Sequence, residues 1–126
     1  MKKVFLIIGG VVFIPLLGLF LFVTNGLTEG KNVVLNGIDL SGIPDGMYIG
    51  MYDFKRWSNT VHAHVKDNEI VSIEIVKDVP GAEVTDCSGE VLRRVLEAQD
   101  TRVDAVTGAT VTSKAYLKAI EDALNN

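Results

Sequence analysis

The sequence predicts an α+β fold in which a small antiparallel sheet packs with two helices and is preceded by one N-terminal transmembrane helix. Three observations support this fold class. An uncharged apolar run begins the chain, three segments rich in β-branched and aromatic residues occupy its middle, and two segments with apolar residues at helical spacing end it. We therefore expect a membrane anchor at residues 1–23, a linker at 24–44 and a folded domain at 45–126.

The anchor is predicted from length and charge. Val4 to Val23 is about twenty residues long and carries no charge, which is enough for a helix to cross roughly 30 Å of hydrocarbon. Lys2 and Lys3 precede it, and the positive-inside tendency places them in the cytoplasm and the later residues outside it. A cleaved signal peptide is the alternative, but Thr24 to Leu27 offers no small-residue cleavage site. We expect a single-pass protein of the cell membrane.

Residues 24–44 are rich in Asn, Gly and Ser with scattered apolar side chains, which is typical of a linker. Its apolar residues indicate that part of it packs on the domain or lies near the membrane surface, and the sequence leaves both open. Beyond residue 23 the chain carries ten of the twelve basic and all sixteen acidic side chains, a net charge of −6. Such an acidic surface argues against a nucleic-acid partner, which requires basic patches.

Three strands are expected in the folded domain. Met47 to Phe54, Thr60 to Lys66 and Glu69 to Lys77 alternate apolar and polar residues. Asp67-Asn68 joins the last two as a tight turn, because both residue types tolerate the positive φ that such turns need. The residues of the third strand expected to face the core are Val71, Ile73 and Ile75.

Two helices follow. The first has Ser88 or Asp86 as its candidate N-cap and runs to near Gln99, and the second has Thr112 or Ser113 as its candidate N-cap. Their apolar stripes are Val91, Leu92, Val95 and Leu96 in the first, and Tyr116, Ala119, Ile120, Ala123 and Leu124 in the second.

A candidate phosphate site lies directly before the second helix. Asp104 to Ser113 reads Asp-Ala-Val-Thr-Gly-Ala-Thr-Val-Thr-Ser. Hydroxyl groups around Gly108, next to the free N–H groups of a helix N-terminus, offer donors and a positive dipole end to an anion. Gly108 lets the loop approach a bulky phosphate, and Ala109 keeps the same space small. An ordinary loop with an N-cap is the alternative, because Ser and Thr favour such positions everywhere.

At these residues the chain resembles the FMN-binding domain of covalent flavoproteins, whose signature is Asp-x-x-Ser/Thr-Gly-Ala-Thr/Ser. Asp45 to Gly50 is similar to the opening of that family, and Lys66 to Val71 is similar to its central hairpin. The similarity covers roughly Asp45 to Leu124 and departs from the family at Tyr52 to Asn59. Such domains occur in Na⁺-translocating NADH:quinone reductase, in Rnf-type complexes and in extracellular electron-transfer flavoproteins.

The resemblance implies that FMN is attached by a phosphoester bond to Thr110. A separate Mg²⁺-dependent flavin transferase would move the FMN moiety from FAD onto this residue. Nothing in the chain looks like a base that could activate a threonine hydroxyl, so we expect a substrate of that transferase and no catalytic residue. The implied cofactor-binding residues are Thr110, Asp104, Thr107, Gly108, Ala109, Thr112 and Ser113.

The implied role is electron transfer with a redox partner protein or a membrane electron donor. We expect an electron carrier or a subunit of an oxidoreductase more than a stand-alone enzyme. The alternative is a non-catalytic membrane-tethered module that binds FMN or another phosphorylated ligand reversibly, or a scaffold for a partner protein.

Other candidate residues have plainer interpretations. His62 and His64 could bind a metal ion, but no third ligand is evident, so we expect them to face solvent and expect no metal site. Trp57 could stack on the flavin ring, although packing over the small core is favoured. Tyr48 is open between flavin contact and sheet packing. Cys87 is expected to be a small buried residue, and Glu121 and Asp122 to lie on the solvated face of the last helix.

Overall fold

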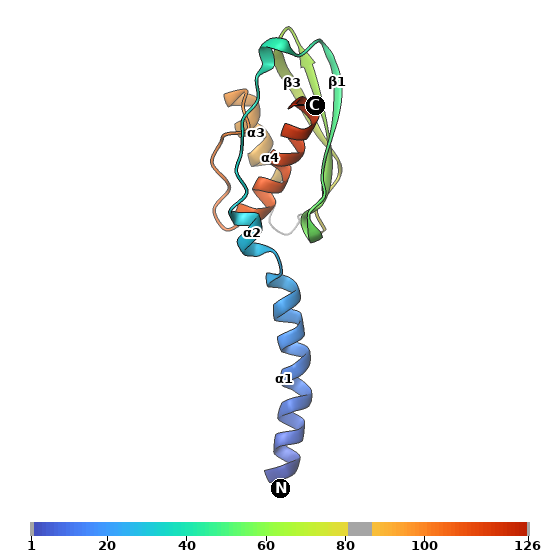
Figure 1. Cartoon of the computed structure of the whole chain (residues 1–126), viewed down its shortest axis with the longest axis vertical. Helices are drawn as coiled ribbons and strands as arrows, with labels where there is room; N and C mark the ends of the chain where they lie inside the picture. Colours follow the sequence, from blue (N-terminus) through green and yellow to red (C-terminus); the bar gives the residue numbers. More distant parts are fainter. Residues whose placement is uncertain (1, 81–86, 126) are drawn as a thin grey trace.

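The computed structural model describes residues 2–80 and 87–125 (Figure 1). The elements in chain order are α1 (Lys2–Thr24), α2 (Leu27–Lys31), the 3-10 helix η1 (Leu40–Gly42), β1 (Gly46–Tyr52), the 3-10 helix η2 (Lys55–Trp57), β2 (Asn59–Lys66), β3 (Glu69–Lys77), α3 (Ser88–Ala98) and α4 (Thr110–Asn125).

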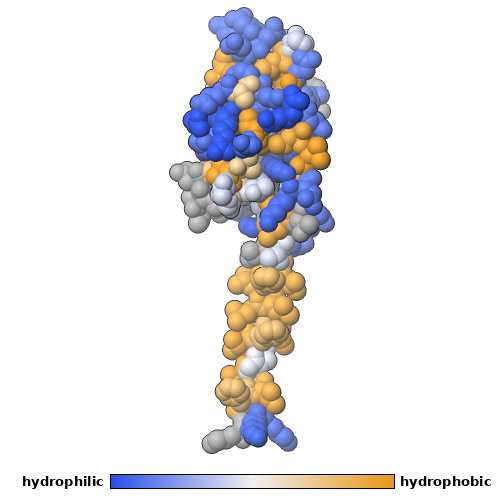
Figure 2. All heavy atoms as spheres, turned by 90° about the vertical axis from the view of Figure 1, so that its left-hand side faces the viewer, coloured by the Kyte–Doolittle hydropathy of each residue, from blue (hydrophilic) through white to orange (hydrophobic). Residues whose placement is uncertain are grey.

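Helix α1 projects from one end of the domain and is apolar over almost its whole length, whereas much of the visible domain surface is hydrophilic (Figure 2). The stretch Lys2–Phe22 is long and apolar enough to cross a membrane. A signal sequence near the N-terminus meets the same criterion. The structure therefore agrees with the expected apolar helix.

The sheet has three antiparallel strands in the order β1-β2-β3, as predicted. Lys66 pairs with Glu69 across the β2–β3 turn. Asp67 and Asn68 form that turn with φ values of 54° and 63°, which is the conformation of a two-residue hairpin turn. The predicted strands and the tight turn are therefore confirmed, although β1 ends at Tyr52 and not at Phe54.

A β-bulge alters which side chains of β3 face the core. His64 pairs with Ser72 and Val65 pairs with Ile70, so Val71 is an extra residue between the two pairs. An extra residue reverses the alternation beyond it. Val71 is 54% exposed and Ile70 only 3% exposed. The prediction that Val71 faces the core is therefore wrong, whereas Ile73 is buried as predicted.

Helix α4 packs on the inner face of β1 and β2, and α3 covers α4 and β3 (Figure 1). A Cβ added to Gly50 of β1 would lie 2.0 Å from the carbonyl oxygen of Ala119, so strand and helix backbones are in direct contact there. The largest side chains fully buried in this core are Trp57, Tyr116, Leu117, Ile120, Val61, Val91 and Val95. The predicted α+β architecture is confirmed.

Both helices begin at other residues than predicted. Ser88 is the first residue of α3, with Cys87 at the N-cap position, and Asp86 lies outside the described residues. Helix α4 begins at Thr110, so Thr112 and Ser113 are helical residues and the prediction of either as N-cap is wrong. The end of α3 is as predicted, because Gln99 follows it as a left-handed C-cap.

The segment after α2 packs on α4. Lys118 Nζ donates to the carbonyl oxygen of Val34 at 3.1 Å, and Asn125 Nδ2 donates to that of Gly37 at 3.0 Å. Of the two positions that the sequence left open, this part of residues 24–44 therefore lies against the domain.

Glu121 lies beneath this segment. Its carboxylate accepts hydrogen bonds from the Asn36 amide at 2.8 Å, from the Gly37 amide at 3.0 Å and from Thr101 Oγ1 at 2.7 Å. It also forms an ion pair with Lys118 at 2.8 Å. Burial raises the pKa of Glu121, but the hydrogen bonds from Lys118, Thr101 and Gly37 outweigh this effect and hold the pKa below its ordinary value. Glu121 is 3% exposed, and Asp122 accepts a bond from an amide of β1. The prediction of a solvated face is wrong, because distant segments cover it.

Candidate functional site

The loop before α4 makes a left-handed turn at Gly108. Its φ is +83°, a conformation that glycine adopts without steric cost. The amide of Ala109 then donates to the carbonyl oxygen of Val106 at 3.0 Å, and Thr110 begins α4. The first amides of α4 have no carbonyl acceptor within the helix, so this end carries a partial positive charge.

A cavity of about 450 Å³ lies beside this loop. This volume is within the range of roughly 300–1,000 Å³ that small-molecule sites occupy. Four segments meet at it: α2, η2, the residues after β3 and the start of α4. Its lining residues are Leu27, Lys31, Arg56, Trp57, Val79, Pro80, Gly108, Ala109, Thr110, Val111 and Thr112.

Four of the seven predicted site residues line the cavity. They are Gly108, Ala109, Thr110 and Thr112. Thr110 and Thr112 are half-buried, Ala109 is buried and Gly108 is exposed. The first turn of α4 therefore places two threonines at the cavity, and Thr110 is the first residue of the helix.

The other three predicted residues are not among those that line the cavity. Ser113 is fully buried and braces the loop, because its Oγ donates to the Ala109 carbonyl oxygen at 2.7 Å and accepts from the Val106 amide at 3.1 Å. Asp104 and Thr107 are exposed. Ser113 therefore stabilises the conformation of the Gly108 loop through hydrogen bonds to its backbone.

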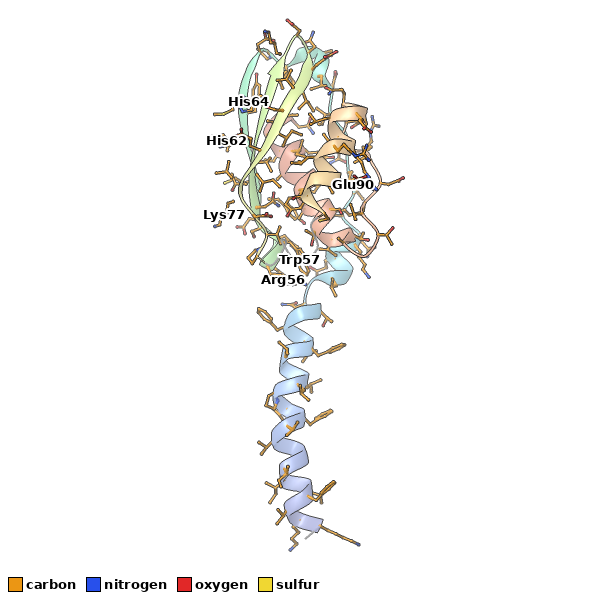
Figure 3. All side chains as sticks on the ribbon, turned by 180° about the vertical axis from the view of Figure 1, so that it is seen from behind. Arg56, Trp57, His62, His64, Lys77 and Glu90 are labelled. Carbon is orange, nitrogen blue, oxygen red and sulfur yellow. The ribbon has the colours of Figure 1, made fainter. Side chains whose placement is uncertain are left out.

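Two cationic side chains, which the sequence analysis did not assign to the site, line the cavity. Lys31 comes from α2 and Arg56 from η2. The Arg56 guanidinium lies 4.4 Å from the centroid of the Trp57 ring, a cation–π arrangement, and Figure 3 shows both at the end of the domain nearest α1. Lys31 and Arg56 are the charged residues among the described residues that line the cavity.

Trp57 both packs in the core and lines the cavity. It is 1% exposed, and its ring stacks with that of Phe54 at a centroid distance of 6.1 Å and an interplanar angle of 20°. The favoured prediction of core packing is therefore confirmed. The same side chain also supplies an aromatic wall to the cavity.

The family model of the FMN-binding domain matches residues 58–125, which is more than half of the chain. The chain belongs to the FMN-binding domain family. The match covers β2, β3, α3, α4 and the Gly108 loop, whereas α2, β1 and η2 precede it. No curated protein matches the chain.

The residues that line the cavity fit the cofactor of this family. Lys31, Arg56 and the first amides of α4 suit a phosphate group. Trp57 and Val79, which are both almost fully buried, supply the apolar part of the cavity lining. The described lining of the cavity thus combines cationic side chains and helix amides with apolar residues.

The remaining candidates lie elsewhere. His62 and His64 point from the sheet away from the helices (Figure 3), and the described residues contain no group of three or more His, Cys, Asp or Glu arranged to hold a metal ion. Cys87 is 1% exposed, as predicted for a small core residue. Tyr48 donates to the Pro44 carbonyl oxygen at 2.6 Å and is not among the cavity residues.

Proposed function

We propose that this chain is a membrane-anchored, extracytoplasmic protein that carries FMN by a phosphoester bond to Thr110 and acts in electron transfer. One observation carries the proposal. In a chain of the FMN-binding domain family, the threonine at the signature position is the first residue of α4 and lies on the wall of a cation-lined cavity.

The covalent step requires a second protein. Thr110 Oγ would form a bond to the FMN phosphorus of FAD, the phosphoanhydride bond to AMP would break, and AMP would leave while the hydroxyl proton passes to a base. Among the described residues that line the cavity there is no His, Asp or Glu to act as that base. This supports a separate flavin transferase that supplies the base, with Thr110 as its substrate.

The anchor supports a location outside the cytoplasm. Helix α1 is long and apolar enough to span a bilayer, and Lys2 and Lys3 favour a cytoplasmic N-terminus. FMN that dissociates outside the cytoplasm is lost to the cell, so a covalent bond has a clear advantage there. FMN supplies the redox chemistry when bound, and the protein orients it and tunes its potential.

The test is the intact mass of the protein produced in membranes together with a flavin transferase. We expect a gain of one FMN less one water, with flavin fluorescence that survives denaturation. Thr110→Ala abolishes both, whereas Thr60→Ala, the same change on β2 and outside the cavity lining, retains them. An adduct that persists in Thr110→Ala would refute the assignment of the attachment residue.

Reversible binding is the second candidate function. The cation-lined cavity favours it, because such a cavity can hold a phosphorylated ligand without a covalent bond. In that case the mass stays unmodified and the flavin separates from the protein on denaturation.

A further inference from the structure

We propose that the juxtamembrane helix α2 forms a wall of the FMN site and that the Lys31 ammonium group binds the phosphate of FMN. This inference rests on FMN binding in the cavity described above. It assigns a cofactor contact to a residue that precedes the stretch 58–125 matched by the family.

One end of α2 is seated on the start of α4. A Cβ added to Gly30 would lie 2.4 Å from Val111 Cγ1, so the two helices touch at this point. Lys114 Nζ donates to the carbonyl oxygen of Lys31 and, at 3.1 Å, to that of Val33. The backbone at Lys31 is therefore fixed beside the first turn of α4, which carries Thr110.

The other end of α2 is seated on η2. A Cβ added to Gly26 would lie 2.8 Å from Lys55 Cδ and 3.2 Å from Trp57 Cζ3. Lys55 Nζ donates to Asn25 Oδ1 at 3.0 Å and lies 3.6 Å from a Glu29 carboxylate oxygen. Helix α2 thus bridges the two elements that supply Arg56 and Thr110, and Figure 1 shows it between the end of α1 and the start of α4.

The charge of the cavity contrasts with that of the chain. Beyond residue 23 the acidic side chains exceed the basic ones, yet the charged residues described on the cavity wall are Lys31 and Arg56. The phosphate of FMN is an anion at neutral pH, and an ammonium group forms a strong charge-assisted hydrogen bond with it. Lys31 is exposed, so its side chain can reach a ligand without loss of an existing ion pair within the described structure.

Riboflavin provides the discriminating probe, because it has the same ring system as FMN and no phosphate. The experiment titrates FMN and riboflavin against the full chain in uncharged detergent, produced without a transferase. We expect Lys31→Ala to weaken FMN binding about fivefold and to leave riboflavin binding unchanged. Lys31→Arg retains the affinity for FMN, because it keeps the positive charge.

Lys66→Ala is the matched control. It removes the same charge at the β2–β3 turn, at the far end of the sheet from η2. We expect its affinities for both flavins to equal those of the unaltered protein.

Two results would overturn the inference alone. In the first, Lys31→Ala behaves as Lys66→Ala does, which would show that Lys31 does not bind the FMN phosphate. In the second, Lys31→Ala weakens the binding of both flavins equally, which would indicate a structural role. Failure of the unaltered chain to bind either flavin would overturn this inference, whereas the proposed function is overturned by the absence of a covalent adduct in the presence of a transferase. The two failures are therefore distinguishable.

Discussion

Gly30 and Val111 are in direct contact, and a Cβ added to Gly30 would lie 2.4 Å from Val111 Cγ1. This contact joins α2, which follows α1 after two residues, to the first turn of α4, which carries Thr110. The position of α2, and with it one wall of the cavity, depends on the absence of a side chain at residue 30.

We predict that Gly30→Ala displaces α2 from α4. The added methyl group overlaps Val111, so we expect the free energy of unfolding to fall by about 1–3 kcal/mol and FMN binding to weaken. Urea denaturation and a flavin titration measure the two effects. Gly42→Ala is the control, because its Cβ would meet no atom within 4 Å, and equal behaviour of both variants would contradict the prediction.

Trp57 should report FMN binding directly. It is the single tryptophan of the chain and lines the cavity, so a bound flavin lies close enough to accept its excitation energy. We expect tryptophan emission to fall on titration with FMN and to reach a plateau. Free tryptophan under the same FMN concentrations corrects for absorption of light by the ligand, and quenching without a plateau would place FMN elsewhere.

Substitution of Gly108 should lower the stability because of its backbone conformation, and not because an added side chain would clash with other atoms. Its φ is +83°, and a Cβ there would meet no atom within 4 Å. We expect Gly108→Ala to lower the free energy of unfolding by about 1 kcal/mol and Gly108→Asn to lower it less, because Asn tolerates positive φ better. Denaturation of the two variants measures this order, and equal losses would argue against backbone strain.

Glu121 should make the stability depend on acid pH. Its pKa in the folded protein lies below the ordinary value of 4.5, so its carboxylate stabilises the fold above that pH and the contribution is lost as the pH falls through the lowered pKa. We expect Glu121→Gln to reduce the dependence of the free energy of unfolding on pH at and below pH 4.5. Glu97→Gln, a change at an exposed carboxylate, should keep it, and identical pH profiles for both variants would refute the assignment.

The local sequence predicted the helices and strands well. The features that it did not predict depend on contacts between segments that are distant in the chain. Asp67 and Asn68 specified their turn by residue type alone. The bulge at Val71 arises from how β3 pairs with β2, so the alternation within β3 could not reveal it. Glu121 is buried by Gly37 and Thr101, which are distant in the chain.

The candidate site was predicted only where its residues are contiguous. The signature placed Thr110 and Gly108 together, and the structure places both at the cavity. Lys31 lies in a stretch whose composition is typical of a linker. Its apolar residues left open whether it packs on the domain, and they did not indicate that Lys31 lies beside α4. Arg56 lies in the turn that departs from the family pattern, so the resemblance did not assign it to the site. Its position next to Trp57, a candidate for stacking on the flavin ring, was the one feature of the sequence that pointed to it.

The short junction between anchor and domain determines where the cavity can meet other molecules. Asn25 and Gly26 alone separate α1 from α2, and Lys55 binds Asn25 across this junction. With α1 in a bilayer, so short a junction would hold the domain close to the membrane surface and would limit its movement relative to α1. A molecule that exchanges electrons with FMN in the proposed site would then have to approach it close to the lipid headgroups.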